Sequence, residues 1–332
     1  MAAEPSAPAH PGPSSHPGPL HDDDHSQHRL LTPDTTTTTT AASSSSSRPP
    51  SPLIICFHGS GESCSPTWDA LATALAAQTR CRVLLYERGA DNPTPEVSTQ
   101  KLRAYLLSGA YLPPLSHDKR QEEAKAKAAG VARTKRGKRE GKEGYSDLQC
   151  PYILVAHSYG GAFARLFLQQ ERKNVVGVVL VETGQEGGLD ARVDEVQLRR
   201  CVLGDRPLVV VRGNSLIGKW RGLEERERMM GAEAEPGKGD KVADGLRQQL
   251  QAQRQMLQLC DAEDERLKKR QLGLSRKNKY VHLEGVGHHV IRDRPDTVVE
   301  AVQWVLENMD LKETTEGLWA MARRRFKGLG RQ

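Results

Sequence analysis

The sequence lacks any hydrophobic run long enough to cross a membrane. A membrane-spanning helix needs about 20 consecutive apolar residues, whereas 37% of the 332 residues are hydrophobic and 27% are charged. The N-terminus also lacks the apolar stretch of a secretory signal peptide. We therefore expect no transmembrane segment and an intracellular, cytoplasmic location.

Paired cysteine motifs are also missing, although the sequence has six cysteines. None has the C-x-x-C spacing of zinc and redox motifs, and Cys56 and Cys81 lie in apolar segments expected to be strands. This pattern is typical of buried free thiols in a reducing compartment rather than of disulfides. The sequence also has no glycine-rich phosphate-binding motif and no metal-ligand constellation, so it predicts no cofactor and no metal site.

Residues 1–50 contain few apolar side chains and consist largely of Pro, His, Ser and Thr. Such a segment cannot bury enough apolar surface to offset the entropy lost on ordering, so we predict a disordered low-complexity tail. Residues 21–25 (His-Asp-Asp-Asp-His) are of the types that bind metals. We expect no metal site there, because a solvated cluster in a disordered tail has no fixed geometry.

Positive charge is concentrated in an internal segment and at the C-terminus. The formal net charge is +6, and residues 117–144 hold ten Lys or Arg against five Asp or Glu. Such a segment can contact phosphates, but it has no interleaved aromatic residues that would stack on bases. We therefore predict a solvated loop insertion, no specific nucleic-acid partner, and a basic tail over residues 311–332.

Between residues 51 and 310, short apolar runs alternate with segments of helical periodicity. Val175–Val181 is an almost continuous apolar run, which is typical of a strand in a parallel sheet covered on both faces. Trp68, Leu71 and Leu75 recur at the spacing of one helix face. The alternation predicts one α/β domain with a doubly wound, mostly parallel sheet and helices on both faces. The other expected strands are 53–57, 81–86, 151–155, 208–211 and 279–283.

A serine flanked by small residues follows one of these expected strands. The run Val155-Ala156-His157-Ser158-Tyr159-Gly160-Gly161 comes after apolar residues and opens a segment of helical spacing. A serine at a tight strand-to-helix turn projects its hydroxyl, and small neighbours let the turn close, so Ser158 is a candidate nucleophile. Ala156 stands where such turns usually carry their first glycine.

Three further motifs accompany this turn along the chain. Leu53–Gly61 ends in His-Gly-Ser-Gly, Leu84–Gly89 ends in Glu-Arg-Gly, and Gly285–His289 is followed by Asp-Arg-Pro. With the Ser158 turn, these motifs resemble the α/β-hydrolase family in the family's own order, over roughly residues 52–309. The resemblance implies that the four motifs are an oxyanion loop, an acidic-Arg-Gly turn, a nucleophile elbow and a catalytic-histidine loop.

The resemblance implies that His288, directly after a glycine, is the catalytic base for Ser158. Imidazole can take and return a proton near neutral pH. The neighbouring His289 could do so on chemistry alone. Because ligands bind outside the carboxyl ends of parallel strands, we expect these side chains to meet at one edge of the sheet.

The acid of the triad is not at its commonest place in the family. After the strand 208–211 the chain continues Arg-Gly-Asn214, without a carboxylate. Glu182, directly after Val175–Val181, matches the location used in some family branches and is the predicted acid. Asp190 and Glu186 on the same loop are alternatives.

The resemblance also implies an oxyanion hole from the backbone N–H groups of Ser60 and Tyr159, shaped by His58 and Gly59. A serine nucleophile excludes the branches that use a carboxylate, such as epoxide hydrolases and haloalkane dehalogenases. We therefore expect a serine hydrolase that cleaves an ester, thioester or amide bond of a small-molecule acyl substrate, without a cofactor.

Two alternatives remain open at this point. Because Asn214 and Ala156 depart from the family pattern, the first is a non-catalytic α/β-hydrolase-fold module that binds a small molecule or a protein. The second is an anchoring or nucleic-acid-associated protein that uses the basic insertion. No feature of the sequence indicates an oligomeric state.

Overall fold

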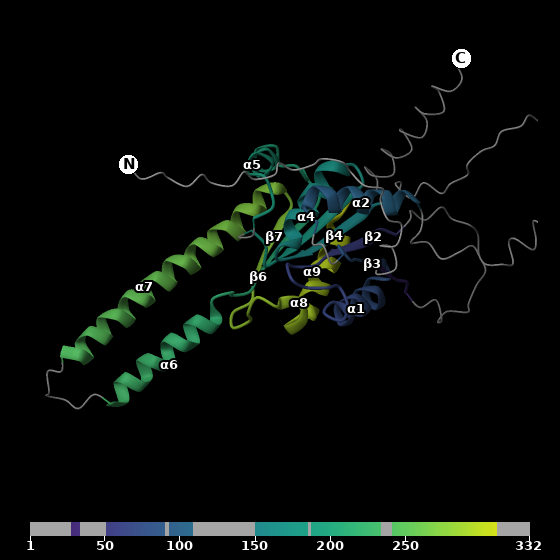
Figure 1. The fold of residues 1–332 in the computed structure, drawn as a ribbon. Coiled ribbons are helices and arrows are strands. Elements are labelled where there is room, and N and C mark those ends of the chain that lie inside the picture. The colour runs from purple at the N-terminus through teal and green to yellow at the C-terminus, as the bar shows by residue number, and fades with distance from the viewer. Residues whose placement is uncertain are drawn as a thin grey trace, which may run out of the picture.

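The computed structural model describes residues 28–33, 51–89, 93–108, 150–184, 187–233 and 241–310, arranged as in Figure 1. The predicted insertion 117–144 and the predicted tail 311–332 lie outside these residues, as does most of the predicted tail 1–50. Among the described helices, none is both long and apolar enough to cross a membrane.

A seven-stranded sheet with the order β1-β3-β2-β4-β5-β6-β7 forms the centre of the described structure. All neighbouring strands are parallel except β1 and β3, which are antiparallel. The predicted α/β class with a mostly parallel sheet is confirmed. The strands are β1 (Arg29–Leu31), β2 (Leu53–Phe57), β3 (Arg82–Tyr86), β4 (Tyr152–His157), β5 (Val175–Val181), β6 (Leu208–Arg212) and β7 (Asn278–His282).

Strand β1 lies in the segment for which the sequence predicts a disordered tail. Leu30 and Leu31 pair with Leu84 and Val83 on the edge of the sheet, and both leucines pack against core residues. The prediction is therefore wrong for this short stretch. Two adjacent leucines in a polar segment can bury apolar surface once a sheet edge with free backbone groups is beside them.

Helices cover both faces of the sheet, because alternate residues of each strand point to opposite sides. Leu53, Ile55 and Phe57 belong to the core beneath α2 and α4, whereas Ile54 and Cys56 belong to the core beneath α1 and α9. Each such fully buried aliphatic side chain contributes about 1.5–3 kcal/mol. The helices around the sheet are α1 (Asp69–Thr79), α2 (Pro95–Ser108), α4 (Gly160–Gln170), α5 (Ala191–Arg199), α8 (Val290–Asp293) and α9 (Pro295–Asn308).

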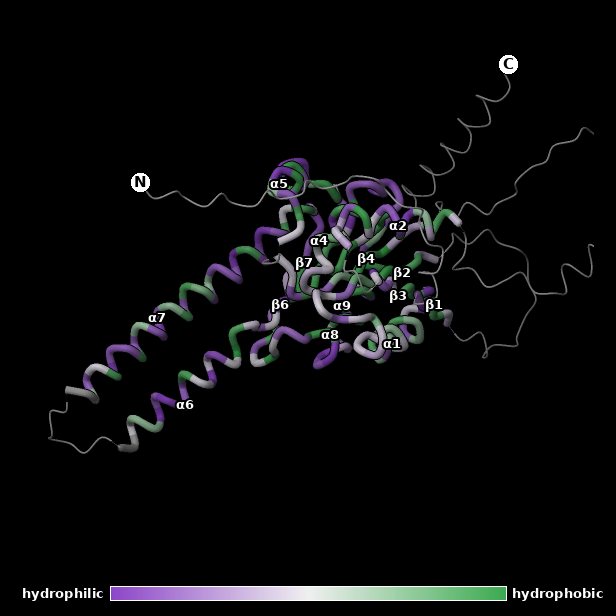
Figure 2. Tube along the Cα trace, viewed as in Figure 1, coloured by the Kyte–Doolittle hydropathy of each residue, from purple (hydrophilic) through white to green (hydrophobic). Residues whose placement is uncertain are grey.

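Helices α6 (Ile217–Glu233) and α7 (Lys241–Arg270) extend away from the sheet as a long hairpin between β6 and β7, as Figure 1 shows. Leu223 of α6 and Leu250 and Leu257 of α7 form a separate small core, against which Trp220 and Met230 pack. Figure 2 shows apolar residues recurring along both helices between polar ones. The hairpin is therefore held together by its own apolar seam and joins the sheet at its base.

The register of the sheet brings the carboxyl ends of the central strands into line. Phe57 pairs with Ala156, His157 with Val181, and Val181 with Val211. The residues that follow β2, β4, β5 and β6 therefore emerge at one edge, where ligands bind in open α/β sheets.

Candidate active site

Ser158 sits at a sharp turn between β4 and α4, and its φ is +52°. A residue other than glycine rarely adopts this left-handed conformation, which points to a constrained turn. Gly160 explains the small residue that follows, since a Cβ there would lie 2.1 Å from the carbonyl oxygen of Phe57. The Ser158 Cβ lies 3.2 Å from where a Cβ on Gly59 would be. The turn is thus packed directly on the loop after β2.

Glu182 follows β5 and also has a left-handed backbone, with φ of +53°. Its carboxylate is completely buried and accepts hydrogen bonds from the Gly213 N–H (2.7 Å) and the Ser215 hydroxyl (2.6 Å). Lys268 Nζ lies 3.3 Å from Glu182 Oε1. Four groups, counting His288, therefore hold this carboxylate at the edge of the sheet.

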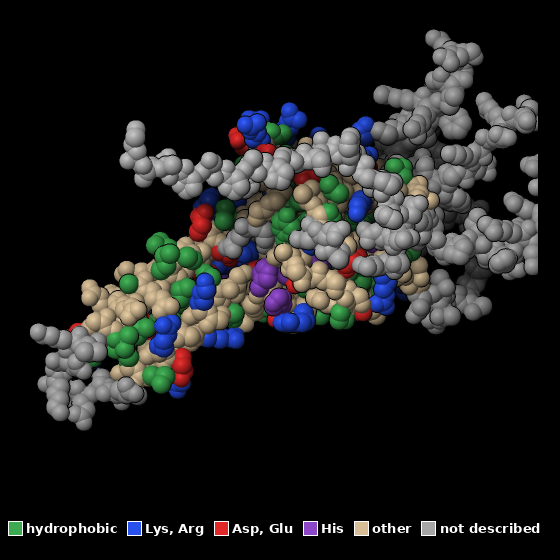
Figure 3. Space-filling view, in the orientation of Figure 1, with side chains coloured by type: hydrophobic (Ala, Val, Ile, Leu, Met, Phe, Trp, Pro, Cys, Tyr) green, Lys and Arg blue, Asp and Glu red, His purple; other side chains and the backbone are tan. Residues whose placement is uncertain are grey.

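His288 lies in the loop after β7, with Nδ1 3.2 Å from Glu182 Oε2 and 3.1 Å from the Ser215 hydroxyl oxygen. Its side chain is 32% exposed. The structure thus joins the predicted base to the predicted acid. His289 points elsewhere, with Nδ1 3.6 Å from Glu62 Oε1. Figure 3 shows histidine side chains at the surface where the hairpin meets the rest of the described structure.

The alternative acid Asp190 has a different partner. Asp190 caps α5, where its Oδ1 accepts a hydrogen bond from the Arg192 N–H. Asn214 forms a local turn through its side-chain oxygen and the Leu216 N–H. Glu186 lies outside the described residues.

The elbow and the histidine loop meet through His157, which directly precedes Ser158. His157 Nε2 lies 2.9 Å from the carbonyl oxygen of His288, and the two rings are 4.8 Å apart between centroids. Within the described residues, no hydrogen bond joins the Ser158 hydroxyl to His288.

Ser60 and Tyr159, the predicted oxyanion-hole donors, are each the next residue in the chain after Gly59 and Ser158, which lie close together. Ser60 follows Gly59 in the loop after β2, and Tyr159 precedes the first turn of α4. Neither backbone N–H donates a hydrogen bond to another residue that the structure describes. Both donors are therefore available to a ligand.

Glu62 and Arg88 fix the loop after β2 from two sides. Arg88 donates hydrogen bonds to the carbonyl oxygens of His58 and Gly59, and Glu62 Oε2 accepts one from the Gly59 N–H (3.1 Å). Glu62 Oε2 also lies 3.3 Å from His157 Nδ1. Sequence reasoning missed Glu62, Ser215 and Lys268, since no motif marks them and only the fold brings them to the site.

The pKa values of the buried Glu182 carboxyl group and the partly buried Glu62 carboxyl group are low. Burial by itself raises the pKa of Glu182, but the hydrogen bond with His288, the Lys268 charge and the bonds from Ser215 and Gly213 outweigh it and lower the pKa to about 2. For Glu62, burial is likewise outweighed by His157, by the Gly59 N–H and by His289, and the pKa is again about 2. Both groups are therefore carboxylates at neutral pH.

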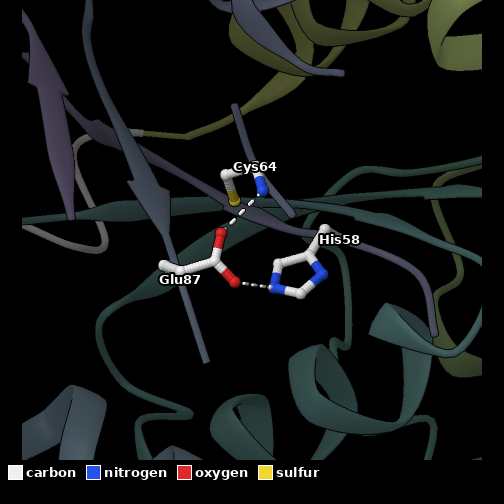
Figure 4. A group of neighbouring side chains, drawn as sticks. All are labelled: His58, Cys64 and Glu87. Atoms are coloured by element: carbon white, nitrogen blue, oxygen red, sulfur yellow. Dashed lines mark hydrogen bonds and ion pairs between the residues drawn. The ribbon is translucent and has the colours of Figure 1, made fainter. Parts of the chain in front are cut away.

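His58, Cys64 and Glu87 are a group of described side chains whose potential metal-ligand atoms lie within 4.8 Å of one another. Figure 4 shows the Glu87 carboxylate reaching both neighbours. Its Oε2 accepts a hydrogen bond from the Cys64 N–H (2.7 Å), and its Oε1 lies 3.0 Å from His58 Nε2. Burial raises the pKa of the Cys64 thiol well above its usual value, which disfavours the thiolate that binds metals. These contacts indicate that the three side chains stabilise the loop after β2.

A family model described as "Alpha/beta hydrolase family" matches residues 54–301. A search of curated proteins found no match. Three solved structures that resemble this chain are the protein Est1E from Butyrivibrio proteoclasticus, a thermophilic esterase from Thermogutta terrifontis and the enol-lactonase from Burkholderia xenovorans LB400. Sequence identities are 13%, 13% and 14%, with TM-scores of 0.42, 0.37 and 0.37. The matches cover 85%, 84% and 84% of this chain and 93%, 92% and 95% of the respective structures.

Proposed function

The chain belongs to the alpha/beta hydrolase family, and we propose that it is a serine hydrolase that cleaves an ester, thioester or amide acyl bond of a small molecule. The observation that carries the proposal is the 3.2 Å contact between Glu182 Oε2 and His288 Nδ1. This contact assigns Nδ1 of His288 to the carboxylate, and we propose that Nε2 is the nitrogen that serves Ser158.

Ser158 is the proposed nucleophile. A serine hydroxyl is a weak nucleophile at its own pKa and needs a neighbouring base. In the proposed reaction, Ser158 Oγ attacks the acyl carbon while its proton passes to His288 Nε2. His288 then donates that proton to the leaving alcohol, thiol or amine, and an acyl-enzyme remains. A water molecule activated by the same nitrogen releases the acid.

The proposed role of Glu182 is to orient His288 and to stabilise its protonated form. Its carboxylate accepts from His288 Nδ1, which keeps the hydrogen on that nitrogen and leaves Nε2 as the base. The low pKa of Glu182 keeps the carboxylate ionised, so it also stabilises the imidazolium that forms. Ser215 supports this geometry because its hydroxyl donates to the same carboxylate oxygen.

The negative charge that develops on the acyl oxygen is proposed to be held by the N–H groups of Ser60 and Tyr159. Each such donor contributes on the order of a hundredfold in rate. Arg88 and Glu62 orient the loop that carries Ser60. A hydrogen bond between Ser158 and His288 is expected to form when substrate is bound, since catalytic hydrogen bonds are often long without ligand.

The proposal is tested by labelling the full-length protein with a fluorophosphonate and by assaying it with p-nitrophenyl esters of increasing acyl length. We expect the label on Ser158, and we expect Ser158→Ala to lower turnover by about a millionfold. Ser63→Ala, at a second serine in the loop after β2, is the matched control and should keep both label and activity. Absence of label would support the non-catalytic binding module instead, and a label on Ser215 would mean that Ser158 is not the nucleophile.

A further inference from the structure

A cavity with a volume of about 210 Å³ lies between α4, α5 and the C-terminal end of α7, where Figure 1 shows these helices converging. Its wall includes Gly161, in the first turn of α4, and Thr183, the residue after Glu182. A Cβ on Gly161 would lie only 2.9 Å from Thr183 Cβ, so helix and loop are in close contact. The cavity therefore comes within one residue of the proposed triad acid.

The wall next to Glu182 is held in a defined conformation. The Thr183 hydroxyl donates to Gln271 Oε1 (2.9 Å), and Gln271 Nε2 donates to the Thr183 carbonyl oxygen (2.8 Å). Both side chains are buried. Because each satisfies the other, this part of the cavity wall is preformed, and the charged side chains of the lining determine what binds.

Three of the described residues that line the cavity are charged: Arg165, Asp194 and Arg270. Asp194 Oδ1 accepts from Arg165 Nη1 (2.5 Å), and its other oxygen accepts from Arg270. Two guanidinium groups thus share one carboxylate. Among the described lining residues there is one positive charge more than there are negative charges.

Arg165 is the more buried of the two, with 6% of the residue exposed. Its Nε donates to Gln197 Oε1 (3.0 Å), but its Nη2 is buried and has no hydrogen-bond partner among the described residues. Burial lowers the pKa of Arg165, and the neighbouring charge of Arg270 lowers it further against the effect of Asp194. A buried guanidinium donor without a partner is costly, and a second acceptor would remove that cost.

We propose that this cavity binds the oxyanion group, carboxylate or phosphate, of a small molecule, and that Arg165 and Arg270 hold it. An oxyanion supplies the missing negative charge and accepts from guanidinium donors in the geometry that arginine favours. A water molecule occupies about 30 Å³ in the liquid, so the cavity has room for a phosphate or a short dicarboxylate. The proposal that the cavity binds an oxyanion depends only on these contacts. The proposal that the oxyanion is part of the substrate rests on the proposed function.

The test is isothermal titration of the full-length protein with glutarate and with inorganic phosphate at low salt. We expect at least one of them to bind with a Kd of about 1 mM or tighter. Arg165→Gln and Arg270→Gln should each weaken binding by about tenfold or more, because each removes a charged donor. Arg266→Gln is the control, since Arg266 lies one turn before Arg270, is exposed and pairs with Glu263 outside the cavity.

If Arg165→Gln fails to fold, the Arg270→Gln variant still tests the proposal. The Arg270 side chain is 44% exposed, and its loss leaves the Arg165–Asp194 pair intact. The proposal is overturned if neither anion binds, if Arg270→Gln binds as tightly as the unaltered protein, or if Arg266→Gln weakens binding equally. The last outcome would mean a general effect of charge.

A second measurement distinguishes an oxyanion that is part of the substrate from a separate anion. If the cavity receives a part of the substrate, glutarate competes with p-nitrophenyl butyrate, and Arg270→Gln lowers the preference for p-nitrophenyl hydrogen glutarate over the butyrate ester. If a separate anion binds, glutarate inhibits or activates without competing. The titration measures binding and requires no turnover. Its result is therefore valid even if the protein proves to have no hydrolase activity.

Discussion

At the scale of single residues, the two strand-end turns that carry Ser158 and Glu182 are the most constrained positions in the proposed triad. Both residues have positive φ, a conformation that is uncommon for residues other than glycine. Such strain persists only where the surroundings enforce it, and it clusters at active sites. At both positions the turn places a polar side chain directly beyond a buried strand, facing the loop of another strand.

Glu182→Gln tests the acid. The amide should keep the size of the side chain and its bond from Ser215, but it loses the negative charge that orients His288. We expect turnover with p-nitrophenyl esters to fall by roughly three to four orders of magnitude. Asp190→Asn is the matched control, because Asp190 only caps α5 and should cost less than about 2 kcal/mol of stability. The assignment is wrong if Asp190→Asn loses activity while Glu182→Gln keeps it.

At the scale of elements, α7 contributes buried charges directly to the proposed triad acid. Lys268 pairs with Glu182 and with Asp264, and Asp264 Oδ2 accepts from Arg212 Nε of β6 (3.0 Å). All four side chains are at most 2% exposed. A chain of alternating charges thus connects the base of the hairpin to the acid, and each member needs its neighbour because unpaired buried charge is unfavourable.

Lys268→Met should therefore affect both stability and the pH dependence of stability. Removing the cation takes the Lys268 charge away from the buried Glu182 and leaves Asp264 with Arg212, which should cost about 3–5 kcal/mol in a urea unfolding experiment. The pKa of Glu182 should rise, because the Lys268 charge helps to lower it, so the free energy of unfolding should decline less steeply between about pH 4.5 and pH 2. Lys269→Met is the control: Lys269 is the next residue, is exposed, and pairs with Glu265. Equal effects of the two substitutions would contradict the network.

The hairpin itself should open independently of the sheet, because its apolar seam is separate from both faces of the main core. Leu257 is 6% exposed and lies in this seam, whereas the adjacent Met256 is 62% exposed. Leu257→Ala should weaken the local packing by about 2–5 kcal/mol and speed amide hydrogen exchange in α6 and α7. Exchange in β2, β4 and β5 should stay slow. Met256→Ala should change neither, and faster exchange throughout the sheet would show that hairpin and sheet unfold together.

At the scale of the whole molecule, the buried carboxylates set the acid limit of stability. The pKa of Glu182 falls from 4.5 to about 2 on folding, so the folded state favours the ionised form. The stabilisation is complete above about pH 4.5 and is lost as pH falls toward 2. A lowering of this size corresponds to roughly 3 kcal/mol for Glu182, and Glu62 acts in the same direction.

Urea unfolding between pH 7 and pH 2 should therefore show a free energy of unfolding that declines from about pH 4.5 downward. In Glu62→Gln the slope of this decline should be smaller, because one carboxylate no longer takes up a proton on unfolding. Exposed pairs such as Arg276 and Asp205 should contribute little, so Asp205→Asn should follow the unaltered protein. A free energy that stays constant down to pH 2 would contradict the low pKa values.

The sequence by itself determined the features that depend on neighbouring residues. Apolar runs such as Val175–Val181 give buried parallel strands because both faces of the sheet need apolar side chains. The turn around Ser158 follows from small residues between a strand and a helix, since only they fit beside Phe57. The predicted contact of Glu182 with His288 is present in the structure, while its role in catalysis stays a prediction.

Only the tertiary structure decided which distant side chains meet at the site. Ser215 and Lys268 reach Glu182 because β5, β6 and the base of α7 converge, and Glu62 reaches His157 because the loop after β2 crosses the end of β4. Strand β1 likewise forms because the edge of β3 is open to pairing. The polar sequence on either side of β1 does not predict this. Periodicity determines which face of an element is buried, but the partner on that face is set by packing between elements far apart in the chain.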